Sequence, residues 1–415
     1  MRPERIVFNH RRAILTKFLH TSDWHLNHIL YDQKRNEQFS AFLTYLHSLI
    51  TRENVDVLLI SGDVFDTTAP SNTALKQYYS FLAGLNGTCC RQVIIIAGNH
   101  DSPSLLEAPK YILEAINVKV VSRPVEEEEI VPVKNKEGAI EAVVLAVPFL
   151  RDSEIQQSTE GQSAEEKEQT LQAAIKAVYQ QLTEKACKIL PQGPIIAMGH
   201  LYLRGSIIGE GQDVHDYIGN LGAVNSEIFP SAIDYVALGH IHVPQVVAGA
   251  TMIRYCGSPL PISFSEADQK KQVVLVTFDQ GQRTIEPLQL PPFCHLKDIK
   301  GDWPIIEKKL KEITEADTWV EVIYTGEGRD LQLRDKVEQI CKEKKLKLLR
   351  VSDMQQYNLL LSSEETEDLA TLSPQQVFQK KLDNLQMEDN LRKVLLDHFK
   401  EIVQNLEEGK KDENP

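Results

Sequence analysis

Apolar runs alternate with amphipathic segments along the first part of the chain. The segments "VDVLLISGDVFD" (55–66) and "RQVIIIAGNHDS" (91–102) each carry an apolar run into a polar, glycine-containing turn. Runs this rich in Val and Ile are typical of strands that are buried on both faces. An earlier segment, 36–50, instead places its apolar residues on one helical face: Phe39, Phe42, Leu43, Leu46, Leu49 and Ile50. This alternation of strands and helices predicts an α/β sheet.

A second group of strands follows. The segments "EAVVLAVPFL", "PIIAMGHL" and "DYVALGHIH" predict buried strands, and the last two end in Gly-His. Between the first two of these strands, a helical face is predicted from Leu171, Ile175, Val178 and Leu182. Two further strands are predicted over 252–260 and 271–279. The chain is therefore expected to form two packed sheets flanked by helices.

The pattern changes at the paired prolines of "LPPFCHL", which predict a domain boundary near residue 291. Beyond it, two helices alternate with two strands in a small α/β module. From Ser373 and Pro374 the pattern is helical, with Ser373 as N-cap. We expect the following organisation: a disordered leader 1–15, a main domain 16–290, a small domain 291–360, terminal helices 361–407 and a disordered tail 408–415.

Composition and charge narrow the class of protein. The 415 residues carry a formal charge of −14, which argues against a general nucleic-acid coat protein but leaves a metal-dependent nuclease open. No apolar run is long enough to cross a membrane, and six scattered cysteines fit a reducing cytoplasm. No phosphate-binding loop for ATP is present. Four glutamates, 126–129, predict a solvated turn.

Polar residues that bind metals follow five of the predicted strands. Asp23 and His25 lie two positions apart in "HTSDWHLN", where an extended chain would point both to one side. The other ligand-type residues are Asp63, Asn99, His100, His200, His240 and His242. Carboxylate, imidazole and amide ligands suit Mn²⁺, Fe²⁺ or Zn²⁺.

Each of these residues alone has an ordinary structural explanation. Asp63 suits a turn cap, Asn99 suits a turn, and a single His200 suits a hydrogen-bonded core position. The joint pattern instead favours a metal site in which an aspartate bridges two ions. Two metals about 3.5–4 Å apart are a recurring device for hydrolysing phosphate esters.

The series D-x-H, G-D, G-N-H-D, G-H and G-H-x-H resembles that of the calcineurin-like metallophosphoesterases. The longer segments "HTSDWHL", "SGDVFD", "AGNHDS", "ALGHIH" and "YCGSPLPISF" resemble one branch in particular, the bacterial SbcD family of DNA-repair nuclease subunits. The resemblance covers residues 17 to 405. It implies a four-layer α/β/β/α sandwich, a small α/β capping domain over 291–360 and C-terminal helices.

The resemblance also implies roles for the site residues. One metal would be held by Asp23, His25, Asp63 and His242. The second would be held by Asp63, Asn99, His200 and His240, with Asp63 as the bridge and Mn²⁺ as the metal. His100 would be the catalytic histidine, which stabilises charge on phosphorus or protonates the leaving oxygen.

Five further residues are open to two interpretations. Asp101 would orient His100 or form a turn. Asp66 stands where archaeal and eukaryotic relatives have a second histidine, and we favour a surface position over a tuning role. Arg204 would lie near a DNA phosphate or in an ordinary surface loop, while Tyr255 and Ser258 would contact a phosphate or pack the backbone.

The function implied is a DNA nuclease subunit that processes duplex ends and cuts hairpins or single strands. Its terminal helices would dock on the coiled coil of an SbcC-like ABC-type ATPase, in a cytoplasmic heterotetramer containing two copies of this chain. One alternative is a phosphatase or nucleotidase for small phosphoesters. Another is a scaffold that keeps the ligands for structure alone.

Overall fold

The computed structural model has two compact units, residues 1–351 and 352–415. It describes residues 15–151, 164–207, 224–247, 249–326 and 330–353, together with Leu396 and Phe399. The predicted terminal helices, apart from these two residues, and the tail lie outside the described residues. So does the predicted leader, except for Leu15, the first residue of a strand.

The first sheet contains six strands. In spatial order they are β14 (Gln282–Gln289), β13 (Gln272–Asp279), β1 (Leu15–Thr21), β4 (Val57–Ser61), β5 (Gln92–Ile96) and β6 (Val118–Val121). The last four run parallel, while β13 pairs antiparallel with both β1 and β14. Parallel strands bring their carboxyl ends to one edge, so the turns after β1, β4 and β5 are neighbours.

The second sheet also contains six strands. Their order is β11 (Gln245–Val246), β12 (Ile253–Tyr255), β10 (Tyr235–Gly239), β9 (Ile195–His200), β8 (Ile140–Ala146) and β7 (Ile130–Lys134). The four inner strands are parallel, and the two edge strands are antiparallel to them. The turns after β9 and β10 therefore share one edge.

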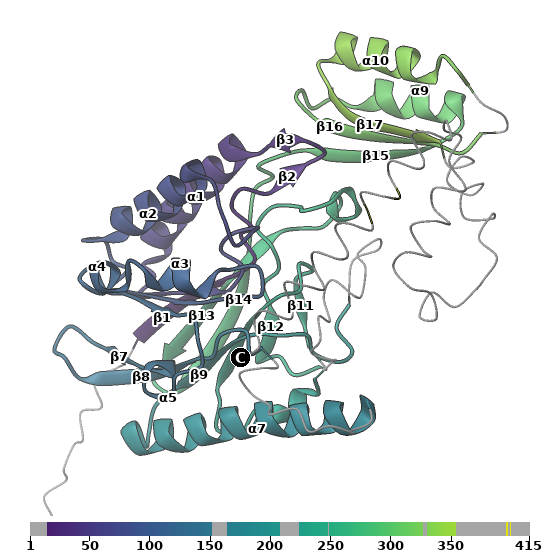
Figure 1. Cartoon of the computed structure of the whole chain (residues 1–415). Helices are drawn as coiled ribbons and strands as arrows, with labels where there is room; N and C mark the ends of the chain where they lie inside the picture. Colours follow the sequence, from purple (N-terminus) through teal and green to yellow (C-terminus); the bar gives the residue numbers. More distant parts are fainter. Residues whose placement is uncertain are drawn as a thin grey trace, which may run out of the picture. The chain divides into compact units, whose positions relative to one another are not determined.

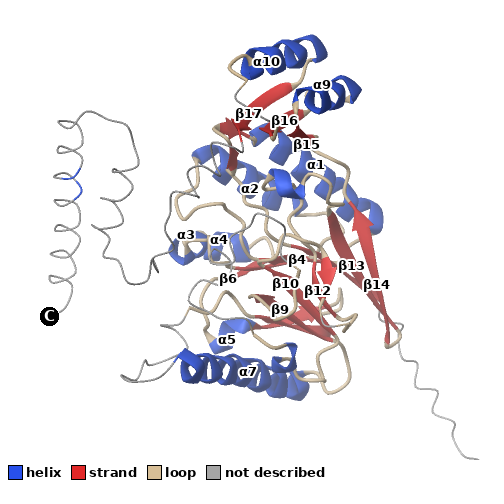
Figure 2. Cartoon of the chain, turned by 90° about the vertical axis from the view of Figure 1, so that its right-hand side faces the viewer, coloured by secondary structure: helices blue, strands red, loops and turns tan. Residues whose placement is uncertain are grey.

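The sheets pack face to face, with apolar side chains such as Leu59, Ile94 and Met198 buried between them. Helices α1 (Asn36–Glu53) and α2 (Asn72–Leu85) lie on the far side of the first sheet, and α7 (Ala164–Ile189) lies on the far side of the second (Figure 2). The predicted four-layer α/β/β/α order is confirmed.

Helix formation follows the apolar pattern. All six apolar residues predicted for the face of α1 are buried. On α7, Leu171, Ile175 and Leu182 are buried as predicted, Val178 is partly buried, and Tyr179 joins them. None of the described helices combines the length and apolar character that crossing a bilayer requires.

The small α/β module has its own sheet and core (Figure 1). Its strand order is β15 (Leu296–Gly301), β16 (Trp319–Tyr324) and β17 (Lys347–Asp353), with helices α9 (Trp303–Glu312) and α10 (Leu333–Lys344). The sequence analysis missed β15, whose alternating charged residues hide its buried Leu296 and Ile299. Asp302 caps α9 by accepting a hydrogen bond from Ile305 N.

Short elements complete the described chain. They are β2 (Ile29–Leu30), β3 (Gln33–Lys34), α3 (Pro103–Glu107), α4 (Lys110–Glu114), α5 (Glu126–Glu129), η1 (Ser226–Ile228) and η2 (Phe264–Glu266). The solvated turn predicted for the four glutamates is wrong. They form α5, and Glu129 is only 3% exposed because it lies between the ends of a helix and a strand.

Candidate metal centre

The ligand-type residues after β1 and β4 leave the strands in left-handed backbone conformations. The φ angles of Asp23, His25 and Asp63 are 52°, 46° and 48°. The extended geometry predicted for Asp23 and His25 is therefore wrong, because β1 ends at Thr21. Instead, the amides of Asp23 and His25 donate to the carbonyls of Gly62 and Asp63, both at 3.0 Å. This pairing turns both side chains towards one point.

Two glycines allow the turns to approach each other closely. A Cβ atom on Gly98 would collide with the carboxylate and amide of Asp63, and one on Gly239 would collide with the carbonyl of Ser61. The two sheets are also joined near this edge, where Ser61 Oγ donates to the carbonyl of Ala237 at 3.0 Å. The centre is thus assembled by close contact between backbones of both sheets.

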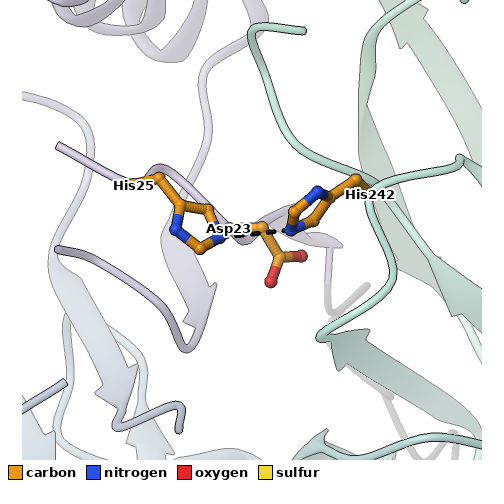
Figure 3. A group of neighbouring side chains, drawn as sticks. All are labelled: Asp23, His25 and His242. Atoms are coloured by element: carbon orange, nitrogen blue, oxygen red, sulfur yellow. Dashed lines mark hydrogen bonds between the residues drawn. The ribbon is translucent and has the colours of Figure 1, made fainter. Parts of the chain in front are cut away.

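Asp23, His25 and His242 form what we call the first half-site (Figure 3). One ligand atom from each of these residues lies within 4.8 Å of the others. The Nε2 atoms of His25 and His242 are 3.2 Å apart, although they come from opposite sheets. All three residues are buried.

Asn99, His200 and His240 form the second half-site. Asn99 Oδ1 lies 3.0 Å from His200 Nε2 and 3.1 Å from His240 Nδ1. Asp63 Oδ2 lies 3.1 Å from His200 Nε2 and 3.7 Å from His25 Nε2. Asp63 therefore stands between the two half-sites, where the sequence analysis expected the bridging ligand.

The hydrogen bonds around the imidazoles test whether a metal fits. Nδ1 of His25 faces the carboxylate of Asp66, and Nδ1 of His242 faces that of Glu266, both at 3.2 Å. Carboxylates only accept, so each Nδ1 carries a proton and the two Nε2 lone pairs point at each other. A shared divalent cation removes this conflict, and the donor set suits one.

The second half-site leads to the same conclusion. His200 Nδ1 donates to the carbonyl of Ser61 at 2.8 Å, which leaves Nε2 facing the oxygens of Asn99 and Asp63. Although burial opposes its charge, the Asp63 carboxylate raises the pKa of His200 to about 9. Burial raises the pKa of Asp23 to about 6. The centre thus attracts positive charge, and a bound metal would displace the protons.

His100 stands at the exposed rim of this centre. Its amide donates to Asp63 Oδ1 and its Nδ1 donates to the carbonyl of Asp66, both at 2.9 Å. Although burial opposes the charged form, Asp63 raises the pKa of His100. The Asp101 carboxylate accepts instead from the amides of Gly98, Val64 and Phe65. Asp101 therefore joins two turns.

The surface position favoured for Asp66 is wrong. Its Oδ1 accepts from Nδ1 of both His25 and His28, at 3.2 and 3.0 Å, because the turn after β4 folds back over the first half-site. His28, which the sequence analysis missed, also donates from Nε2 to the carbonyl of Ile262 at 2.9 Å. Asp66 is thus a partner of a metal-ligand histidine.

The remaining candidates are distributed differently. Tyr255 and Ser258 are fully buried. The Tyr255 hydroxyl donates to the carbonyl of Leu201 at 2.7 Å, and Ser258 Oγ donates to that of Leu260 at 2.9 Å, so both hold backbone. Arg204 is exposed, in the segment that bridges to Val224.

The sequence analysis also missed Glu266 and its neighbour Lys271. Glu266 is completely buried and Lys271 is 6% exposed, yet "SEADQKK" contains several polar residues that look alike in sequence. Although burial would raise it, the pKa of the Glu266 carboxyl is held well below its usual range by Lys271. Only the fold distinguishes these two residues from their exposed neighbours.

Comparison with known proteins identifies the family. A family model described as calcineurin-like phosphoesterase matches residues 16–244, a range that contains all seven predicted ligands. A second, described as type 5 capsule protein repressor C-terminal domain, matches residues 292–385. The D subunit of nuclease SbcCD from Escherichia coli (strain K12) is 36% identical over 375 residues, covering 88% of this chain and 92% of that protein.

The chain belongs to the SbcD family of calcineurin-like phosphoesterases. Other proteins with the same name are similar to it. The one from Rhodobacter capsulatus is 35% identical over 64% of this chain and 67% of its own length. The one from Bacillus subtilis is 28% identical over 76% of each chain. The SbcD family predicted from the sequence is thus confirmed.

Proposed function

We propose that this chain is the metal-dependent nuclease subunit of an SbcCD-type complex that trims duplex DNA ends and cuts hairpins or single strands. The observation that carries the proposal is the pair of half-sites that share Asp63 beneath an exposed histidine. Its family relatives are named nuclease subunits. The donor set suits two divalent ions, and we propose Mn²⁺ as the physiological metal.

The ligands of each ion follow from the two half-sites. Asp23, His25 and His242 would hold one ion, and Asn99, His200 and His240 would hold the other. Asp63 would bind both. Two divalent ions in this position supply the Lewis acidity that phosphodiester hydrolysis needs.

His100 then acts on the leaving group. The Asp66 carbonyl fixes the proton on His100 Nδ1, so Nε2 is the nitrogen available to the substrate. A cationic imidazole donates its Nε2 proton to the departing sugar oxygen and stabilises the charge on the phosphate. Asp101 supports this step indirectly by holding together the two turns that carry His100 and Asp63.

The small module contacts the main domain beside the first half-site. Tyr31 Oη donates to Glu321 Oε1 of the module at 3.0 Å, and Arg350 lies over the Tyr31 ring. Trp319 and Leu296 of the module share an apolar cluster with Phe264. These contacts support a role for 291–360 as a cap that guides DNA towards the centre.

Partners complete the proposal. We propose that residues 361–407 dock on the coiled coil of an SbcC-like ABC-type ATPase in the cytoplasm, and that two copies of this chain associate within the complex. Tyr111 and Ile112 on α4 are 85% and 74% exposed, an apolar pair that supports self-association. ATP would be bound by the partner.

A cleavage assay tests the function. The purified chain, with and without the ATPase, is incubated with Mn²⁺ and a hairpin DNA, and separately with a phosphomonoester. We expect DNA cleavage that a chelator abolishes and little turnover of the monoester. The reverse preference would favour a phosphatase, and cleavage that survives His100→Ala unchanged would remove His100 from the mechanism.

A further inference from the structure

A buried ion pair lies directly behind the first half-site. Glu266, in η2, and Lys271, in the segment that leads into β13, are joined by a 2.6 Å contact between Oε2 and Nζ. Their side chains are 0% and 6% exposed. A buried ion pair is costly to desolvate, so its presence beside a metal ligand requires an explanation beyond stability.

The pair holds both the ring and the backbone of His242. Glu266 Oε1 accepts from Nδ1 of His242 at 3.2 Å, and Lys271 Nζ donates to the carbonyl of the same residue at 3.3 Å. The remaining Lys271 contacts are Ser258 Oγ at 3.0 Å and Gln269 Oε1 at 2.9 Å. His242 is therefore fixed at two points by one charged unit.

Glu266 itself has little freedom to move. Its Oε2 also accepts from the amide of Ile262 at 3.1 Å. In the same turn, Phe264 is buried in the cluster that it shares with Leu296 and Trp319 of the small module. The carboxylate is thus anchored by backbone, by a cation and by packing, as a partner that orients a ligand must be.

We propose that Glu266, with its charge balanced by Lys271, is a positioning residue that sets the metal affinity of the first half-site through His242. Its carboxylate fixes the proton on Nδ1, aims Nε2 at the ion and makes the imidazole a stronger ligand. Lys271 keeps the carboxylate ionised in a buried position. This inference rests on the two-metal centre proposed above.

The two half-sites respond differently if this is correct. Mn²⁺ binding to the full chain is measured by calorimetric titration for the wild type and for Glu266→Gln, which keeps the shape and removes the charge. The wild type should bind two ions. In the variant, one ion should bind at least about tenfold more weakly, while the other keeps its affinity within about twofold.

Asp268→Asn is the matched control. It removes a carboxylate from the same segment, but Asp268 forms its ion pair with Lys297, away from the ligands, and its side chain is 87% exposed. Both affinities should match those of the wild type. A double variant with His242→Ala assigns the effect: Glu266→Gln should cause no further loss for the ion that remains.

Folding is followed separately, by the melting temperature without metal. If Glu266→Gln does not fold, the variant Glu266→Gln/Lys271→Met, which removes both charges together, is titrated in its place with the same criteria. Unchanged affinities in a folded variant, or equal weakening of both ions, would overturn the inference and leave a merely structural ion pair. A wild type that binds fewer than two ions would instead overturn the two-metal proposal.

Discussion

The two half-sites hold their histidines in different ways. In the first half-site, both imidazoles donate to carboxylates, those of Asp66 and Glu266, at 3.2 Å. In the second, His200 donates to the backbone carbonyl of Ser61, and Asn99 contributes a neutral oxygen. A carboxylate behind an imidazole raises its basicity, so the first half-site should bind its ion more tightly. Unequal affinity can thus arise from the partners of the ligands.

Removing the shared ligand should have the largest effect, because it abolishes the comparison. Asp63→Asn takes away the one charge that both half-sites use, while it keeps an oxygen for the His100 amide. We expect DNA cleavage to fall by about 10⁴-fold, equivalent to several kcal/mol of lost electrostatic stabilisation. The measurements are cleavage rate and Mn²⁺ stoichiometry. Retention of two tightly bound ions would contradict a bridging role.

His100 separates holding a metal from using it. His100→Ala should lower the cleavage rate by about 10²–10³-fold, since it removes a proton donor, while both Mn²⁺ affinities stay close to wild type. The rate is measured at saturating Mn²⁺ and the affinities by titration. If an ion is lost, His100 is a ligand, which its place within 4.8 Å of ligand atoms of His25 and Asp63 permits.

Asp66 tests the first half-site alone. Asp66→Ala removes the partner of His25 and should weaken one ion by about 10–100-fold, with the second half-site unchanged. Asp32→Asn is a suitable control, because it removes an exposed carboxylate nearby and asparagine accepts the φ of 62°. The comparison between half-sites fails if Asp66→Ala weakens the ion held by Asn99 instead.

Glu129 shows the contrast with a buried carboxylate that lacks such partners. Its Oε1 has no hydrogen-bond partner among the described residues, and burial raises its pKa from 4.5 to about 7. The folded state therefore binds a proton that the unfolded state has released. Stability from this group is complete below about pH 4.5 and is lost as the pH rises through about 7, by up to about 3 kcal/mol.

Glu129→Gln should remove this loss. The variant should unfold at a higher denaturant concentration than the wild type at pH 8 and show less difference from it at pH 5. Cleavage activity should not change, because Glu129 lies on α5, away from the ligands. Parallel pH profiles of the two proteins would show that Glu129 carries no such penalty.

The sequence was most informative where strand ends determine the site. Parallel strands end at one edge, so the order of apolar runs and polar turns is enough to predict that Asp63, Asn99 and His200 meet. The same logic predicts the four layers, since each layer has its own apolar period. It failed for the local geometry of Asp23 and His25, because the chain leaves the strand in a left-handed conformation that no apolar pattern encodes.

Residues that support the ligands were harder to predict. Asp66 and Glu266 act through contacts 41 and 24 positions away along the chain. Each lies among other charged residues, and no spacing rule connects it to its histidine. Burial is the property that distinguishes Glu266 from exposed Asp268, and burial at this point depends on packing between the main domain and the small module.

The most direct test of the two-metal centre is an anomalous diffraction measurement on crystals grown with Mn²⁺. We expect two peaks about 3.5–4 Å apart, one beside Asp23, His25 and His242 and one beside Asn99, His200 and His240, with Asp63 between them. At limiting Mn²⁺, the first peak should be the stronger. A single peak, or none within reach of Asp63, would contradict the account.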